Sequence, residues 1–113
     1  MIFRQSMTSE YSKIESLPLG GQRITTLICG DAILRKMTNL KELNLSNNKI
    51  VEIQHLSDLK GLQSLTLSYN RIVETQNLSL PILTALNLDR NRIKKVVGLR
   101  GLKKLEELSL EGN

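Results

Sequence analysis

Few side chains in this 113-residue sequence have the types and spacing that catalysis or metal binding requires. The chain has one cysteine, Cys29, and one histidine, His55, and no pattern links them as nucleophile and base. Asp31, Asp58 and Asp89 lack a spacing that would gather carboxylates around a metal ion. The sequence also lacks phosphate-binding, zinc-protease and serine-hydrolase motifs. We therefore expect no enzyme activity, no cofactor and no metal site.

The strongest charge feature is a run of basic residues between positions 90 and 104, which contains no acidic residue. Such a run could meet phosphate, an anionic membrane surface or an acidic protein tail. It lacks the aromatic residues on which single-strand nucleic-acid binders stack bases. Most of its members alternate with apolar residues, as on an ordinary solvated face, so anionic-surface or nucleic-acid binding is only a third hypothesis. The members are Arg90, Arg92, Lys94, Lys95, Arg100, Lys103 and Lys104.

These side chains are carried by a pattern that occurs four times, over residues 40–50, 62–72, 83–93 and 105–113. Each copy has the form Leu-x-x-Leu-x-Leu-x-x-Asn, and its asparagines are 22, 21 and 22 residues apart: Asn48, Asn70, Asn91 and Asn113. This pattern resembles the leucine-rich repeat, and in particular its SDS22-like class of 22-residue repeats. The resemblance implies an α/β repeat fold, a right-handed solenoid with a concave parallel β-sheet and a convex side of 3₁₀ turns or short helices.

Two periodicities support this architecture. The Leu-x-Leu alternation in each copy predicts a short strand with one buried face. After Asn48 the apolar residues recur at every third position, which suits 3₁₀ turns better than a regular α-helix. The asparagines lie where each strand bends, and the resemblance implies that they form a buried structural ladder. In the third return segment, Thr75 and Pro81 interrupt the pattern, so we expect that segment to be irregular or extended.

We divide the chain at residue 22. Residues 1–22 show no repeat, and they are either a leader or a partial cap on the first repeat. Residues 23–113 carry a degenerate repeat, with Ile24, Leu27 and Cys29 in the leucine frame, followed by the four regular copies. The last copy stops at its asparagine, which leaves its leucines uncovered. We expect that the chain is the N-terminal part of a larger protein, or that it self-associates through this open end.

The remaining functional surface is the concave face, where the exposed strand positions form columns of small polar side chains. Tyr69 is the one large aromatic residue among them, and tyrosine and arginine dominate interaction hot spots. A solvated strand face without a binding role is the competing interpretation. The candidate partner-binding residues are Glu42, Asn44, Asn47, Thr66, Tyr69, Asn87, Asp89 and Arg90.

The function we expect is an intracellular protein–protein interaction scaffold. A single cysteine favours a reducing, cytoplasmic compartment, and the sequence has neither a signal peptide nor a membrane span. We expect a protein partner and no small-molecule substrate. The family resemblance implies ciliary, centrosomal, cytoskeletal or phosphatase-regulatory proteins. The alternative is a targeting domain of a multidomain enzyme whose catalytic part lies C-terminal.

Overall fold

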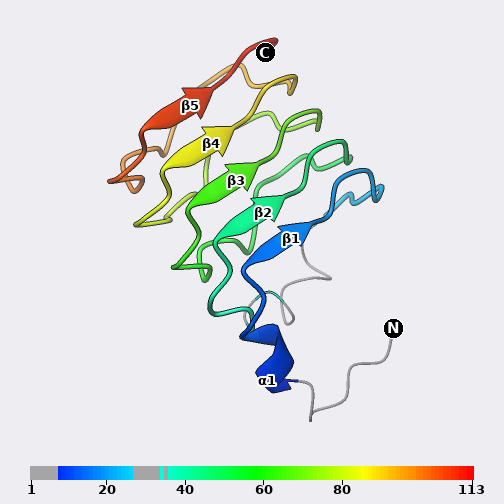
Figure 1. The fold of residues 1–113 in the computed structure, drawn as a ribbon. Coiled ribbons are helices and arrows are strands. Elements are labelled where there is room, and N and C mark those ends of the chain that lie inside the picture. The colour runs from blue at the N-terminus through cyan, green and yellow to red at the C-terminus, as the bar shows by residue number, and fades with distance from the viewer. Residues whose placement is uncertain (1–7, 27–33, 35) are drawn as a thin grey trace.

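The computed structural model of the protein describes residues 8–26, 34 and 36–113, and it has one short helix followed by five strands (Figure 1). The helix α1 spans Thr8–Tyr11. The strands are β1 Ser16–Pro18, β2 Glu42–Asn44, β3 Ser64–Thr66, β4 Ala85–Asn87 and β5 Glu107–Ser109. All neighbouring strands pair in parallel, in the order β1-β2-β3-β4-β5, so the chain winds as a solenoid and the predicted fold class is confirmed. None of the described helices is long and apolar enough to cross a membrane.

The leucine in the middle of each strand sets the register of the sheet. Leu17, Leu43, Leu65, Leu86 and Leu108 are paired with one another across the five strands. The three central ones are at most 2% exposed, whereas Leu108 is 40% exposed because β5 has a neighbouring strand on one side only. A fully buried leucine contributes about 1.5–3 kcal/mol. Burial of this column therefore holds each strand in register with the next.

The convex side from residue 36 onward contains tight turns and no helix. The amide of Leu59 donates to the carbonyl of Leu56, and the amide of Leu62 donates to that of Leu59, both at 3.0 Å. The same three-residue hydrogen bonds join Leu99, Leu102 and Leu105. The predicted 3₁₀ character is thus limited to single turns, and the predicted short helices are not found here. Each turn returns a leucine to the core, which explains the spacing of three.

The interrupted third return segment is irregular, one of the two expected outcomes, with a bend at Asn77 and a turn between Leu80 and Leu83. Glu74 forms an isolated parallel bridge with Lys95. The next residue, Thr75, is fully buried, and its hydroxyl donates to the carbonyl of Val97 (2.6 Å) and accepts from the amide of the same residue (2.7 Å). The hydroxyl replaces a backbone partner, so its burial leaves no polar group unpaired.

The asparagines form the expected buried ladder, and each one links two repeats. The side-chain amide of Asn70 donates to the carbonyls of Leu45 (2.9 Å) and Leu67 (3.0 Å), and its Oδ1 accepts from the amide of Ile50 (3.0 Å). The carbonyl of Leu67 accepts in addition from Asn91 (2.9 Å). The carbonyls of Leu45, Leu67 and Leu88 are each shared in this way by two asparagines from successive repeats. The amides satisfy the backbone groups that the bend removes from the strand ladder.

The sheet begins earlier than the sequence analysis expected. β1 lies inside the segment predicted to be a leader or partial cap, and it pairs with β2. The carbonyl of Ile24 accepts from the amide of Lys49, as that of Ile50 accepts from Arg71, so Ile24 holds the position after the bend that Ile50 holds in the next repeat. The frame predicted from Ile24 is corrected to Ile14-x-x-Leu17-x-Leu19-x-x-Gln22-x-Ile24. The other members of the predicted frame, Leu27 and Cys29, lie outside the described residues.

The helix α1 lies beside the β1 end of the sheet (Figure 1). Its last residue, Tyr11, is 6% exposed and belongs to the hydrophobic core, and the Lys36 ammonium lies 5.8 Å from the centre of its ring. Burial raises the pKa of the Tyr11 hydroxyl above its ordinary value, because the phenolate is poorly solvated there. From Tyr11 onward, the segment before β1 covers the first repeat as a cap would.

Candidate protein-binding face

The exposed strand positions form two columns across the sheet, in the predicted register. The first is Glu42, Ser64, Ala85 and Glu107, and the second is Asn44, Thr66, Asn87 and Ser109. Because most of these side chains are small, a hollow of about 420 Å³ opens over β3, β4 and β5. The structure thus brings four of the predicted binding residues, Glu42, Asn44, Thr66 and Asn87, onto one surface.

Three of the predicted binding residues also hold the strand ends. Oδ1 of Asn44 accepts from the amide of Ser46 (2.9 Å), and Oδ1 of Asn87 accepts from the amide of Asp89 (2.9 Å). Oδ1 of Asp89 accepts from the Ser109 hydroxyl and from the amide of Glu111 (2.8 Å). Asp89 therefore ties the β4 loop to the β5 loop. This structural role was not apparent from the sequence.

A further column lies in the loops after the strands and consists of Gly21, Asn47, Tyr69, Arg90 and Gly112. All five residues have left-handed backbone conformation. The φ angles are 68° at Gly21, 56° at Asn47, Tyr69 and Arg90, and 74° at Gly112. The amides of Asn47, Tyr69 and Arg90 each donate to a carbonyl in the following repeat, which fixes this geometry. Glycine and asparagine adopt it readily, whereas other residues are strained by roughly 1–2 kcal/mol. Tyr69 and Arg90 are therefore the two members of this column whose backbone is strained.

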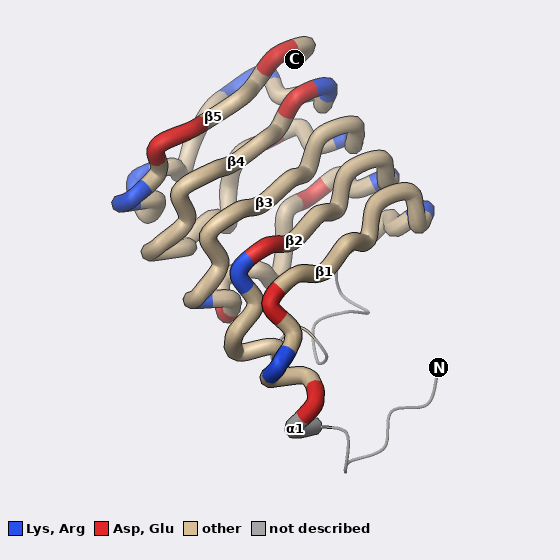
Figure 2. The backbone as a smooth tube through the Cα atoms, in the orientation of Figure 1, with Lys and Arg blue, Asp and Glu red and all other residues tan. Residues whose placement is uncertain are grey.

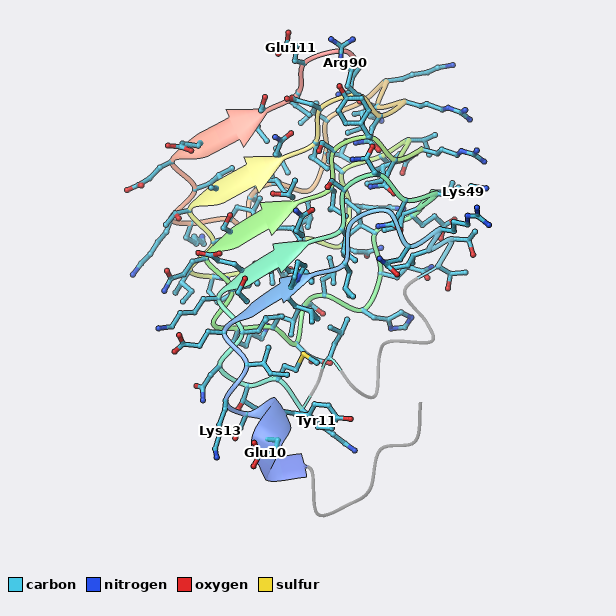
Figure 3. All side chains as sticks on the ribbon, turned by 45° about the vertical axis from the view of Figure 1, so that its right-hand side comes forward. Glu10, Tyr11, Lys13, Lys49, Arg90 and Glu111 are labelled. Atoms are coloured by element: carbon cyan, nitrogen blue, oxygen red, sulfur yellow. The ribbon has the colours of Figure 1, made fainter. Side chains whose placement is uncertain are left out.

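Tyr69 and Arg90 stand at the rim of the concave face. Tyr69 is 55% exposed, and beside it lies a polar hollow of about 360 Å³ lined by Asn47, Tyr69, Arg71, Arg90 and Arg92. Arg90 lies close to the C-terminus, next to Glu111 (Figure 3). A Cβ atom added to Gly112 would lie 2.6 Å from Cδ of Arg90, so the glycine makes room for the arginine side chain. The predicted residues Asn47, Tyr69 and Arg90 are thus neighbours.

The basic run between positions 90 and 104 extends along the return segment that joins β4 to β5. Arg90 and Arg92 follow the carboxyl end of β4 and line the same hollow, whereas Lys103 and Lys104 lead into the amino end of β5. Figure 2 shows these basic positions at opposite ends of the strands. The other members, Lys94, Lys95 and Arg100, are exposed on the return segment between these two groups. The run is therefore spread along the whole return segment instead of being gathered at one end of the sheet.

The structure groups Arg92 instead with basic residues that the sequence analysis passed over. Arg23, Lys49 and Arg71 occupy the equivalent place in earlier repeats, each one residue before an isoleucine. The signal that could have found them is the recurrence of a basic residue between the asparagine position and this isoleucine.

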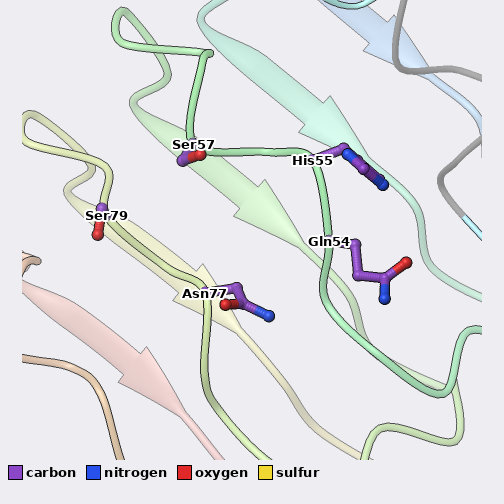
Figure 4. Close-up of a pocket in the computed structure, with 5 residues that line it drawn as sticks. All are labelled: Gln54, His55, Ser57, Asn77 and Ser79. Atoms are coloured by element: carbon purple, nitrogen blue, oxygen red, sulfur yellow. The ribbon is translucent and has the colours of Figure 1, made fainter.

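A third hollow, of about 340 Å³, lies on the return side and is lined by Gln54, His55, Ser57, Asn77 and Ser79 (Figure 4). His55 and Asn77 have positive φ angles of 61° and 63°, and the Asn77 side chain donates to the carbonyl of Ile53 (2.9 Å). The hollow therefore results from a turn that recurs in successive repeats, at His55 and at Asn77. Over the described ranges, 8–26, 34 and 36–113, no three histidine, cysteine, aspartate or glutamate side chains gather as metal ligands would.

Solved structures similar to this chain include two internalins and a leucine-rich repeat domain. An internalin, InlF, from Listeria monocytogenes is 30% identical with a TM-score of 0.80, over 94% of this chain and 30% of its own. Internalin C2 (InlC2) from the same organism is 26% identical with a TM-score of 0.68, over 93% of this chain and 54% of its own. The leucine-rich repeat domain of APL1B is 25% identical with a TM-score of 0.56, over 85% of this chain and 24% of its own.

This chain thus spans well under two thirds of each of those longer proteins. No curated protein matches it. The family model described as "Leucine rich repeat" matches residues 12–72, a range that includes β1 and therefore agrees with the corrected first repeat. With a parallel strand in every repeat and a shared asparagine ladder between them, the chain belongs to the leucine-rich repeat family.

Proposed function

We propose that this chain is a protein–protein interaction module that binds its partner through the concave face, with Tyr69 as the main anchor residue. The observation that supports this most is the combination of exposure and strain at Tyr69. The side chain is 55% exposed, and its backbone has a φ of 56° where asparagine or glycine would be less costly. Strained positions persist where function requires them. An exposed tyrosine with this backbone is a recognisable interaction anchor.

The surroundings of Tyr69 have the composition of a binding face. Arg90 adds a second hot-spot residue type beside it, and the hollow over β3, β4 and β5 offers room for a protruding side chain of the partner. Four strand spacings of about 4.8 Å and strands of about 10 Å give the sheet a projected area of about 190 Å². A stable interface buries about 800 Å² on each partner. The partner would therefore have to contact the loops that carry Tyr69 as well as the strands.

We further propose that the module acts in the cell interior and binds without catalysis. The single cysteine supports a reducing compartment, and the repeat family is typically an interaction fold. A scaffold of ciliary, centrosomal, cytoskeletal or phosphatase-regulatory type is the context implied by the resemblance to SDS22-like repeats.

The test is partner capture by variants that keep the fold. The double variant Tyr69→Asn/Arg90→Asn removes both large side chains and retains a residue that tolerates the left-handed backbone. The matched control is Lys13→Asn/Lys60→Asn, two exposed residues outside the concave columns. Proteins captured by the natural chain are identified by mass spectrometry, and the binding of each purified candidate is then measured by calorimetry. We expect the concave variant to lose affinity by about tenfold or more. Equal binding by both variants would refute the assignment of the face.

A further inference from the structure

A row of basic side chains runs along the edge of the solenoid where the chain leaves the carboxyl ends of the strands. It consists of Arg23, Lys49, Arg71 and Arg92, one from each of four successive repeats, and we call it the basic row. The amides of the last three donate to the carbonyls of Ile24, Ile50 and Ile72 at 2.8, 2.8 and 2.9 Å, so the backbone fixes their alignment. Figure 2 shows the basic residues at the tips of these loops.

No ion pair joins a member of the basic row to a carboxylate in the part of the chain that the structure describes. All four side chains are exposed, and the ion pairs that do form join Lys13 with Glu10 and Lys41 with Glu15. Successive members are one repeat apart, a spacing of about 4.8 Å in the sheet, so their charges repel one another. Arg71 and Arg92 also line the polar hollow beside Tyr69. An anionic ligand would relieve this repulsion.

An apolar strip lies next to the basic row. Val51 and Val73 are 45% and 42% exposed, and each follows a row member by two positions. The isoleucines between them, Ile50 and Ile72, are fully buried, so the alternation turns the valine and the basic side chain outward together. Glu52 and Glu74 follow Val51 and Val73 in the chain, and these four residues line one hollow together. These carboxylates limit the width of the surface that an anion can occupy.

We propose that the basic row and its valines bind an extended acidic segment of a protein partner, in which glutamate or aspartate alternates with apolar residues. Three repeat spacings of about 4.8 Å make the row about 14 Å long, which four or five extended residues span. Carboxylates on one side of such a segment meet the basic row, and apolar side chains meet the valines. The assignment goes beyond the proposed function and does not depend on the concave face.

A nucleic acid fits this edge less well than a peptide does. Tyr69 is the one aromatic residue beside the row in the described structure, whereas single-strand binders stack a series of bases on aromatic side chains. A continuous polyanion would also meet Glu52 and Glu74 beyond the valines. An acidic peptide can place apolar residues at that border.

The experiment measures binding of a fluorescein-labelled peptide of about seven residues, with alternating glutamate and valine, by fluorescence anisotropy. The variant Lys49→Gln/Arg71→Gln/Arg92→Gln should lose affinity by about tenfold or more. The matched control Arg100→Gln/Lys103→Gln/Lys104→Gln removes the same charge from exposed residues elsewhere, and it should change affinity less than about twofold. A peptide with glutamine in place of glutamate should bind about tenfold more weakly. Added salt should lower the affinity of the chain for the acidic peptide.

Three results would overturn the proposal. Equal losses in the two triple variants would show diffuse attraction to the net charge of +5 instead of a site. Tighter binding of oligouridine or of phosphatidylserine vesicles through the same residues would assign the edge to a different class of ligand. Absence of peptide binding would refute the proposed peptide site altogether. If the triple variant does not fold, amide NMR shifts in the natural chain decide: shifts at residues 49, 71 and 92 support the site, and shifts confined to residues 100–107 refute it.

Discussion

The variant Asn70→Ala tests whether the buried ladder is the main polar determinant of stability. Asn70 is 7% exposed and lies between β3 and β4 in the chain, with a repeat on either side. The substitution removes the side chain that donates to Leu45, Leu67 and Ser68 and that accepts from Ile50. The leucine carbonyls keep a second asparagine, Asn48 for Leu45 and Asn91 for Leu67. The amide of Ile50 loses the partner that the side chain supplied.

The magnitude follows from this inventory. An orphaned buried donor costs about 1–3 kcal/mol, and each hydrogen bond lost from a carbonyl that keeps another partner costs about 0.5–1.5 kcal/mol. With two such leucine carbonyls, we expect a loss of roughly 2–6 kcal/mol in the free energy of unfolding. Domains of this size have about 5–15 kcal/mol in total. Asn70→Ala should therefore remove a large share of the stability.

The assay is urea unfolding followed by far-ultraviolet circular dichroism, with an unchanged m-value as the check that one transition is being measured. The matched control is Asn44→Ala, which removes an exposed strand asparagine whose Oδ1 accepts only from Ser46. We expect that control to cost about 0.5–1 kcal/mol. If the two variants lose the same free energy, water replaces the buried amide and the ladder does not stabilise the fold as described.

Three further substitutions test other parts of the structure. Tyr69→Asn should raise the free energy of unfolding by about 0.5 kcal/mol, since asparagine tolerates the left-handed backbone; a loss in urea unfolding would contradict the strain assigned to this column. Thr75→Val should lower it by about 1–3 kcal/mol, because the amide and carbonyl of Val97 lose the hydroxyl; a neutral result would mean that Val97 finds another partner. Since the pKa of Tyr11 is raised, its stabilisation is complete below about pH 10 and is lost as the pH rises through the raised value. Tyr11→Phe should remove that alkaline loss, with Tyr69→Phe as the control, and an unchanged alkaline melting profile would contradict it.

The regular part of the fold could be predicted because one physical cause sets it. A leucine that is buried in every strand fixes the register, so Glu42, Ser64, Ala85 and Glu107 had to fall in one column. The first repeat escaped prediction because Gln22 stands at the asparagine position and lies 26 residues before Asn48. Its strand also contains a proline and precedes two glycines, which are turn signals in a single sequence.

The residue types of the site could be predicted from the sequence, but the backbone conformation of those residues could not. Tyr69 and Arg90 were identified as large side chains among small ones, but their φ angles depend on hydrogen bonds to the following repeat. The basic row was missed because its members are separated by 26, 22 and 21 residues. The contiguous run from Arg90 to Lys104 appeared stronger in the sequence, although it is spread along the return segment from the end of β4 to the start of β5. Repeat position, and not proximity in sequence, decides which charges meet.

The sharing of each leucine carbonyl by two asparagines has a consequence for how the chain folds. Since the hydrogen bonds of the ladder that join two repeats each span about one repeat, adding a repeat closes a loop of roughly 22 residues whatever the length already folded, at about 2.7 kcal/mol of closure entropy. Folding can therefore start at any adjacent pair of repeats and propagate from there, as in a one-dimensional chain of coupled units. The kinetic barrier is set by the first pair. A defect at one asparagine weakens the coupling between the repeats on either side of it, so propagation slows at that point.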